Sequence, residues 1–262
     1  MKHWLVLIGM FLLVSRAPAS SISPEARSQL VPSGKLRAAI NYGNPVLATK
    51  NPQTGELRGV TVDLSQELGR QLGVPVELVG YETVAKLMAG LKADEWDAAF
   101  LAMDPARAGD VAFTAPYMEV EVTYLVPEQS DIRSVSQVDR ANVRIAVQEK
   151  NAADLFLSKE LKHASLVRAP DEAGAFGLLK AGAAEALASN TQRLLSVAET
   201  YPGYRVTEGR FTAIQHAAGV LTVRSAAAAY LRSFIEEVKA SGFVKRALEK
   251  AGLRGVVVAP PA

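Results

Sequence analysis

The sequence has no cysteine among its 262 residues, which excludes disulfides, thiolate metal ligands, a cysteine nucleophile and a lipid-modified cysteine anchor. An excess of one charge is also missing, because 29 Lys and Arg residues stand against 27 Asp and Glu residues. This balance provides no basic field for nucleic acid. With 49% hydrophobic residues the chain is too apolar for disorder, and its length predicts one large or two medium domains.

The sequence motifs of several common enzyme classes are missing as well. No stretch matches the nucleophile elbow G-x-S-x-G, the zinc motif H-E-x-x-H, the P-loop or the dinucleotide-binding G-x-G-x-x-G. Beyond residue 3 the sequence has only two histidines, His163 and His216. They are too few and too far apart in the sequence to predict a metal cluster. We therefore expect a protein that is not an enzyme and needs no cofactor or metal.

An apolar run long enough to cross a bilayer is missing, but a shorter one opens the chain. Residues 4–14 form it, and as a helix they would span only about 16 Å. Small residues at 17–19 follow at the spacing that signal peptidase recognises. We expect a signal peptide over residues 1–19, cleaved after Ala19, and then a polar leader over residues 20–33. The mature protein would be soluble in the periplasm, without a membrane anchor.

From residue 34 onward, strand patterns alternate with helical ones. Residues 60–72 carry apolar side chains at helical spacing opposite a charged face. Strands are expected on either side, over residues 35–40 and 74–79. A second helix over residues 84–91 and a short buried strand over residues 97–101 follow. This order predicts an α/β fold with a doubly wound, mostly parallel sheet.

The same alternation returns in the second half of the chain, beyond a polar segment at residues 127–136. The expected elements are strands over residues 143–147, 166–168 and 184–188 and helices over residues 152–161 and 173–179. Two such units predict two lobes. The tail over residues 226–251 is expected to give two helices with no strand between them.

Several phrases occur in the order typical of one family. They are KLRAAINYG at residues 35–43, GELRGVTVDL at 55–64, LKADEWDA at 91–98, DPARA at 104–108 and FTAPY at 113–117. With its helical tail, the chain resembles the family 3 extracellular solute-binding proteins of the polar-amino-acid type over nearly all of residues 34–252. Asp94 departs from the family, which usually has glycine there.

This resemblance implies a type II periplasmic binding protein, with two lobes joined by two hinge strands and ligand held in the cleft between them. Lobe 1 is then expected over residues 34–123 plus 217–262, and lobe 2 over residues 124–216. The implied function is capture of a small carboxylate-bearing ligand, an amino acid or related organic acid, by a monomer. The implied partners are the membrane subunits of an ABC importer, and no nucleic acid.

Arg107 is the leading candidate for gripping a carboxylate. A buried strand is expected to end just before it, and Asp104 followed by Pro105 is typical of a helix start. We expect Arg107 in the first turn of that helix, at the crevice beyond the strand, where a guanidinium can donate two parallel hydrogen bonds to a carboxylate. Asp104 aligns with a threonine that the family uses for the carboxylate, and a helix cap is the alternative role for it.

The other candidates also follow expected strands. Tyr42 and Asn44 lie where the family places an aromatic residue over the ligand, and packing of Tyr42 on its own lobe is the alternative. Lys150 and Asn151 align with a helix N-terminus that binds the carboxylate; solvation is the alternative for Lys150. Asn190 replaces the aspartate that pairs with the α-ammonium. Because a neutral amide lacks that charge, we expect ordinary α-amino acids to bind weakly or not at all.

Two other functions occur on this fold. An enzyme similar to cyclohexadienyl dehydratase would use Glu185, Lys150 and Asn190 for acid–base elimination, and turnover of prephenate or arogenate would reveal it. An accessory protein of a periplasmic quinoprotein dehydrogenase would bind that enzyme in place of a transporter, and a pull-down from periplasm would reveal it.

Overall fold

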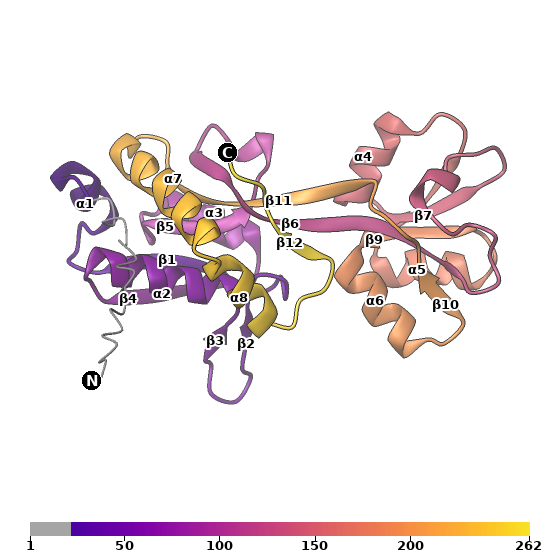
Figure 1. Ribbon diagram of the computed structural model, residues 1–262, viewed down its shortest axis with the longest axis horizontal. Helices are drawn as coiled ribbons and strands as arrows, with labels where there is room; N and C mark the ends of the chain where they lie inside the picture. Colours follow the sequence, from indigo (N-terminus) through magenta and orange to yellow (C-terminus); the bar gives the residue numbers. More distant parts are fainter. Residues whose placement is uncertain (1–21) are drawn as a thin grey trace, which may run out of the picture.

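The computed structural model describes residues 22–262, so the expected signal peptide lies outside the described residues. Two groups of elements, here called lobe 1 and lobe 2, lie at the two ends of an elongated molecule (Figure 1). No helix among the described residues is long and apolar enough to cross a membrane.

Lobe 1 contains α1 (Pro24–Leu30), β1 (Leu36–Asn41), β2 (Thr49–Lys50), β3 (Leu57–Arg58), α2 (Val60–Leu72), β4 (Val76–Tyr81), α3 (Val84–Lys92), β5 (Ala98–Ala102), the 3-10 turn η1 (Pro105–Arg107), α7 (Ser225–Ala240) and α8 (Phe243–Lys250). Lobe 2 contains the 3-10 turn η2 (Val135–Gln137), β7 (Arg144–Gln148), α4 (Ala152–Glu160), β8 (Ser165–Ala169), α5 (Glu172–Lys180), β9 (Ala186–Asn190), α6 (Thr191–Thr200) and β10 (Tyr204–Val206). Three further strands lie between the lobes: β6 (Val111–Pro127), β11 (Thr212–Leu221) and β12 (Val256–Val258).

The main sheet runs through both lobes in the order β4-β1-β5-β11-β6-β9-β7-β8, with β10 and β12 also paired to β6. In lobe 1, β1 pairs in parallel with β4 and β5, and in lobe 2, β7 pairs in parallel with β8 and β9. The expected α/β fold with parallel strands in each half is confirmed. The carboxyl ends of these strands therefore share one edge in each lobe.

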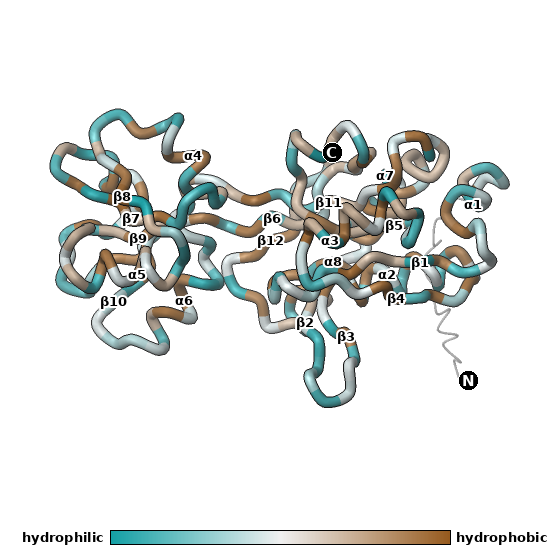
Figure 2. The backbone as a smooth tube through the Cα atoms, turned by 180° about the vertical axis from the view of Figure 1, so that it is seen from behind, coloured by the Kyte–Doolittle hydropathy of each residue, from teal (hydrophilic) through white to brown (hydrophobic). Residues whose placement is uncertain are grey.

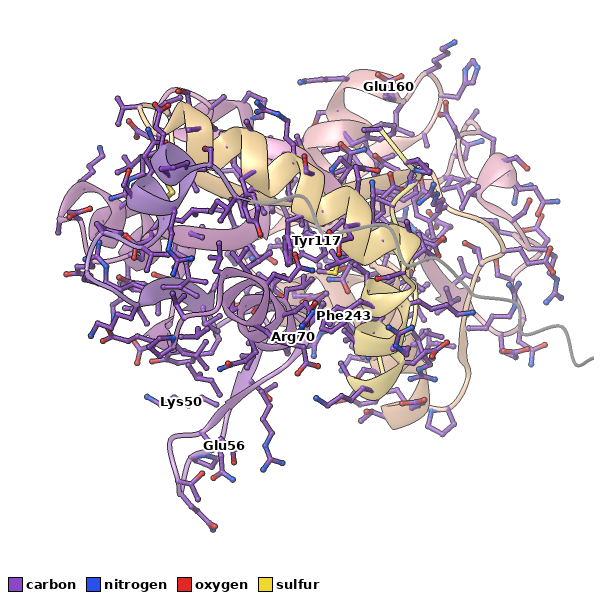
Figure 3. All side chains as sticks on the ribbon, turned by 60° about the vertical axis from the view of Figure 1, so that its left-hand side comes forward. Lys50, Glu56, Arg70, Tyr117, Glu160 and Phe243 are labelled. Carbon is purple, nitrogen blue, oxygen red and sulfur yellow. The ribbon has the colours of Figure 1, made fainter. Side chains whose placement is uncertain are left out.

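Each lobe packs helices on both faces of its part of the sheet, because successive strand residues point to opposite faces. In β5, Phe100 contacts the core cluster under α2, α7 and α8, whereas Leu101 contacts the cluster under α3. In β9, Ala188 belongs to the cluster that includes residues of α4, whereas Leu187 belongs to the cluster that includes residues of α5 and α6. Figure 3 shows Tyr117 in the packed interior, whereas Glu56 lies on the projecting β2–β3 hairpin. That hairpin is mostly hydrophilic at its tip (Figure 2).

Long antiparallel strands make the connection between the lobes. β6 is 17 residues long and pairs with β11 from Val122↔Thr212 to Val111↔Leu221, with register shifts near His216. β12 adds a third strand by pairing with β6 at Met118 to Val120. β12 could not be predicted from the sequence, because three consecutive valines show no alternation of apolar and polar residues.

Helix α1 lies within the segment that the sequence analysis treats as a polar leader. Its start is encoded locally, because Ser23 accepts a hydrogen bond from the Ala26 backbone N–H and Pro24 is the first helical residue. Ala26 and Leu30 are buried, one helical turn apart. Gln29 accepts a hydrogen bond from the backbone N–H of Ala227 in α7, so the segment is part of lobe 1.

The LKADEWDA phrase forms the turn into β5 and joins three segments of lobe 1. Trp96 is fully buried, and its indole N–H donates to a backbone carbonyl of α3. Asp97, also fully buried, accepts hydrogen bonds from Arg37 of β1 and Arg224 at the start of α7. Asp94 has a φ of +53°, in the left-handed region that favours glycine, which accounts for the glycine usual in the family.

Candidate functional site

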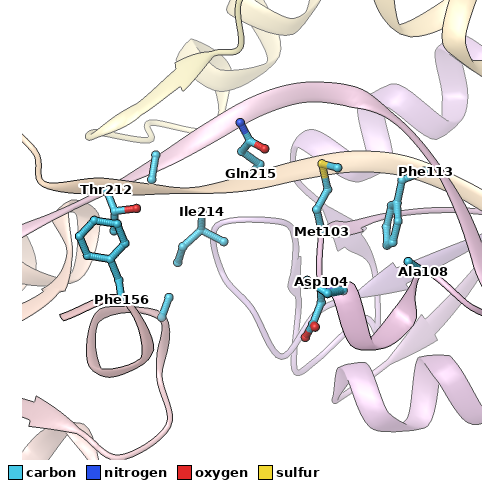
Figure 4. A pocket seen from close by; sticks show the side chains of 11 residues that line it. Met103, Asp104, Ala108, Phe113, Phe156, Thr212, Ile214 and Gln215 are labelled. Carbon is cyan, nitrogen blue, oxygen red and sulfur yellow. The ribbon is translucent and has the colours of Figure 1, made fainter. Parts of the chain in front are cut away.

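A cavity of about 530 Å³ lies between the lobes beneath β11 (Figure 4), and we call it the α4 cavity. Lobe 1 supplies the connection from β5 to β6, lobe 2 supplies the start of α4, and β11 closes one side. The lining residues are Met103, Asp104, Pro105, Ala108, Phe113, Ala152, Phe156, Thr212, Ala213, Ile214 and Gln215. This wall is mostly apolar, and Asp104 is its one ionisable side chain.

A second cavity of about 510 Å³ also takes its walls from both lobes, and we call it the α6 groove. Its walls come from the loop after β1 and the end of α8 in lobe 1, and from α5, β9 and α6 in lobe 2. The lining residues are Asn44, Pro45, Val46, Glu172, Asn190, Gln192, Arg193, Ser196, Ala251, Gly252 and Leu253. Arg254, which follows α8, links lobe 1 to α6 of lobe 2. Its backbone N–H donates to Gln192 at 2.6 Å, and its side chain pairs with Glu199 at 2.7 Å.

Arg107 lies beside the α4 cavity, but its guanidinium contacts two neighbouring residues of lobe 1, Ala102 and Asp104. Its Nη1 donates to the carbonyl oxygen of Ala102 at 2.7 Å, and its Nη2 is 3.4 Å from Asp104 Oδ2. The prediction of a helix here is wrong. Arg107 is the last residue of a single 3-10 turn, because β6 begins at Val111 and leaves no room for a longer helix. About one fifth of the side chain remains exposed.

Asp104 serves as the cap of that turn. Its Oδ1 accepts a hydrogen bond from the backbone N–H of Ala106 at 2.9 Å, which confirms the alternative role in the sequence analysis. Its carboxylate also reaches into the space between the lobes (Figure 4). Asp104 therefore adds a carboxylate to the wall of the cavity.

Tyr42 lies in lobe 1, outside both interlobe cavities. It lines a hollow beside the β2–β3 hairpin, and the ammonium of Lys50 sits 4.9 Å from the centre of its ring. The ring packs closely over Gly80, where a Cβ atom would lie 3.2 Å from Tyr42 Cε1. Asn44, two residues later, lines the α6 groove. The loop after β1 therefore separates two residues that the sequence analysis groups together.

The loop after β7 presents Lys150 and Asn151 at the start of α4. Asn151 caps α4 by accepting a hydrogen bond from the Asp154 backbone N–H at 2.8 Å. Lys150 is exposed and has a φ of +60°, in the left-handed region where the related motif has glycine. Its backbone N–H donates to Asp154 Oδ2 at 2.8 Å. This bond helps to hold the loop that precedes Ala152 of the α4 cavity.

Asn190 ends β9 and caps α6, with its Oδ1 accepting from the Arg193 backbone N–H at 2.9 Å. The structure thus brings Asn44 and Asn190 together across the α6 groove. Glu185 lies at the opposite end of β9, where it pairs with Arg144 at 2.6 Å. Because a strand rises about 3.3 Å per residue, Glu185 and Asn190 do not share a site. Glu185 therefore does not join Asn190 in the group that the enzymatic alternative would use.

Several cavity residues have no signal in the sequence. Glu172 at the start of α5 accepts a hydrogen bond from the buried Ser189 hydroxyl at 2.7 Å and pairs with Arg193 at 3.3 Å. Phe156 lines the α4 cavity. A helical pattern in the sequence indicates that such residues lie on a helix. It does not indicate which helices come together at a cavity. Among residues 22–262, no group of three or more His, Asp or Glu residues is placed to hold a metal ion.

The family model of the bacterial extracellular solute-binding proteins, family 3, matches residues 36–253. The chain belongs to this family. An ABC transporter glutamine-binding protein of Bacillus subtilis is 25% identical to this solute-binding protein over 252 residues, covering 91% of this chain and 92% of the relative. A glutamine-binding protein of Geobacillus stearothermophilus is 24% identical over 202 residues, covering 76% and 77%.

Solved structures share the fold of this solute-binding protein. An ancestral cationic amino acid solute-binding protein has a TM-score of 0.65 at 22% identity, covering 86% of this chain and 98% of the other. A solute receptor for L-cysteine from Neisseria gonorrhoeae has a TM-score of 0.63 at 23% identity, covering 89% and 99%. An ancestral cyclohexadienyl dehydratase has a TM-score of 0.60 at 23% identity, covering 89% and 99%.

In this solute-binding protein, His216 and Gln215 lie on β11 at the hinge. Gln215 points away from Ile214 (Figure 4) and donates to Glu119 of β6, which also pairs with Arg210 at 2.7 Å. His216 is almost fully buried, and its Nε2 has no hydrogen-bond partner among the described residues. Burial, with a smaller contribution from the charge of Arg107, lowers the pKa of His216 to about 4.

Acidification is expected to destabilise the protein through His216. Because its pKa is about 4 when folded and about 6.5 when unfolded, its stabilising contribution is complete above pH 6.5 and is lost as the pH falls toward 4. We expect the free energy of unfolding to fall by about 1 kcal/mol from pH 7.5 to pH 5.5. Urea denaturation at the two pH values measures this difference.

Two variants isolate the histidine. His216→Gln should abolish most of the difference between the two pH values, whatever its effect on stability at pH 7.5. His163→Gln should retain the difference, because His163 is exposed. An unchanged pH difference in His216→Gln would show that another group is responsible.

Proposed function

We propose that this chain is a periplasmic receptor that captures a small carboxylate-bearing ligand, an amino acid or related organic acid, between its lobes. It would deliver the ligand as a monomer to the membrane subunits of an ABC importer. The observation that carries the proposal is the pair of cavities whose walls come from both lobes, in a member of an extracellular solute-binding family.

The hinge supplies the mechanism. β6 and β11 pass between the lobes, so a bend in them changes both interlobe cavities at once. A ligand that contacts both lobes stabilises the closed form by its differential affinity for that form. The importer would then respond to the closed arrangement of the lobes and not to the small molecule alone.

Within this proposal Arg107 binds the ligand carboxylate from lobe 1. A guanidinium has five N–H donors, and the contacts to Ala102 and Asp104 use only its two terminal nitrogens. Arg107 therefore retains donors for a carboxylate. Asp104, Asn44, Asn151, Lys150 and Asn190 would complete the binding shell when the lobes close. Tyr42 lies outside both interlobe cavities here, and it would contact the ligand only if closure brought the loop after β1 over it.

Isothermal titration calorimetry tests the proposal with purified protein and a panel of amino acids, dicarboxylates and hydroxycarboxylates. We expect saturable 1:1 binding of at least one carboxylate, together with a smaller radius of gyration by X-ray scattering when that compound is bound. Absence of binding by the whole panel would refute the proposal. Turnover of prephenate or arogenate would instead establish an enzyme on this fold.

A further inference from the structure

Three asparagines at the carboxyl ends of strands share one arrangement. Asn44 Oδ1 accepts from the Val46 backbone N–H at 3.1 Å, and Asn151 and Asn190 use their Oδ1 atoms to cap α4 and α6. Each asparagine is only partly buried. Asn44 and Asn190 line the α6 groove from lobe 1 and lobe 2, and Asn151 directly precedes Ala152, which lines the α4 cavity.

These cap bonds fix the orientation of each amide. Only the oxygen of a side-chain amide can accept from a backbone N–H, so each Nδ2 must lie on the opposite side of the group. Within residues 22–262, no hydrogen bond is formed by Nδ2 of Asn44, Asn151 or Asn190. The three side chains therefore have hydrogen-bond donors available for a ligand.

The acids near these donors are already engaged. Asp104 caps η1 and lies beside Arg107. Glu172 accepts from the Ser189 hydroxyl with one oxygen and pairs with Arg193 through the other. Lys150, by contrast, has no carboxylate within 4 Å in the described part of the chain. The polar groups left available around the two cavities therefore include amide donors and a cation, together with the hydroxyls of Thr212 and Ser196, which can donate as well as accept.

We infer that the ligand presents oxygen acceptors to these asparagines and has no ammonium group at lobe 2. The chemical class is a small organic acid with at least two acceptor groups, a dicarboxylate or a hydroxycarboxylate. This inference rests on the proposed function and narrows its ligand. An ammonium placed against Asn190 would meet Nδ2–H donors and lose its own hydrogen bonds to water, which disfavours α-amino acids.

Asn190→Asp is the decisive variant. Aspartate caps a helix as well as asparagine does, so α6 should stay intact while the available donor becomes a carboxylate oxygen. Calorimetry compares succinate and malate with glutamine, arginine and cysteine on the wild type and the variant. We expect the wild type to prefer succinate or malate, and the variant to weaken that binding roughly 10- to 100-fold while gaining affinity for an α-amino acid.

Asn142→Asp is the matched control for the added charge. Asn142 is exposed and precedes β7, at the edge of the lobe 2 sheet opposite the one that bears the asparagines. The ligand preference of the Asn142→Asp protein should equal that of the wild type. If both aspartate variants lose affinity equally, net charge and not Asn190 sets the preference, and the inference is overturned.

The remaining outcomes separate this inference from the proposed function. Binding of an α-amino acid by the wild type, as tightly as any panel acid, overturns the inference and leaves the receptor proposal standing. If Glu172→Gln then abolishes that binding, the ammonium partner is Glu172. Unchanged acid binding by Asn190→Asp also overturns the inference. No binding by any of the compounds overturns both.

Discussion

Replacing Asp97 by alanine is expected to lower the free energy of unfolding by about 3–5 kcal/mol, the cost of removing one member of a buried ion pair. Asp97 is fully buried, and its oxygens accept from the backbone N–H and guanidinium of Arg37 and from the guanidinium of Arg224. The two arginine side chains are only 18% and 14% exposed. Without this carboxylate, the two guanidinium groups would share only the carboxylate of Asp94, which is 65% exposed.

Guanidinium chloride denaturation followed by tryptophan fluorescence measures this loss. Asp131→Ala is the matched control, because Asp131 pairs with Arg140 at 2.7 Å but is 76% exposed. An exposed pair contributes about 0–1 kcal/mol, so the control should change the midpoint little. Equal effects of the two substitutions would show that the Asp97 network contributes no more than a surface pair.

Removing the Arg107 side chain is expected to weaken binding of the carboxylate ligand by roughly 30- to 1000-fold, which corresponds to about 2–4 kcal/mol. Calorimetry with the tightest-binding compound of the carboxylate panel measures the loss. Arg107→Lys should lose less than Arg107→Ala, because an ammonium keeps the charge but not the paired donors of a guanidinium.

Arg140→Ala controls for the loss of one positive charge, because Arg140 pairs with Asp131 away from both cavities. It should bind as the wild type does. Far-UV circular dichroism and the unfolding midpoint of Arg107→Ala show whether the η1 turn survives the loss of the bond to Ala102. Wild-type affinity in a folded Arg107→Ala protein would exclude Arg107 from the binding shell.

Local elements could be predicted closely from the sequence. Helix α2 begins and ends where its apolar spacing places it, because that spacing depends only on neighbouring turns. The caps by Asp104 and Asn151 are local in the same way, since each bond spans three residues or fewer. Arg107 was harder to predict, because the start of β6, fixed by pairing with a distant strand, cuts its helix short.

The sequence by itself determined the order of strands and helices, the family and the polar residues that follow each strand. Only the tertiary structure decided which of those residues share a cavity. Asn44 and Asn190 line the same groove, whereas Tyr42 lines a hollow beside the β2–β3 hairpin. The physical reason is that local spacing fixes a helix or strand, whereas the placement of one lobe against the other depends on the long-range pairing of β6 with β11 and β12.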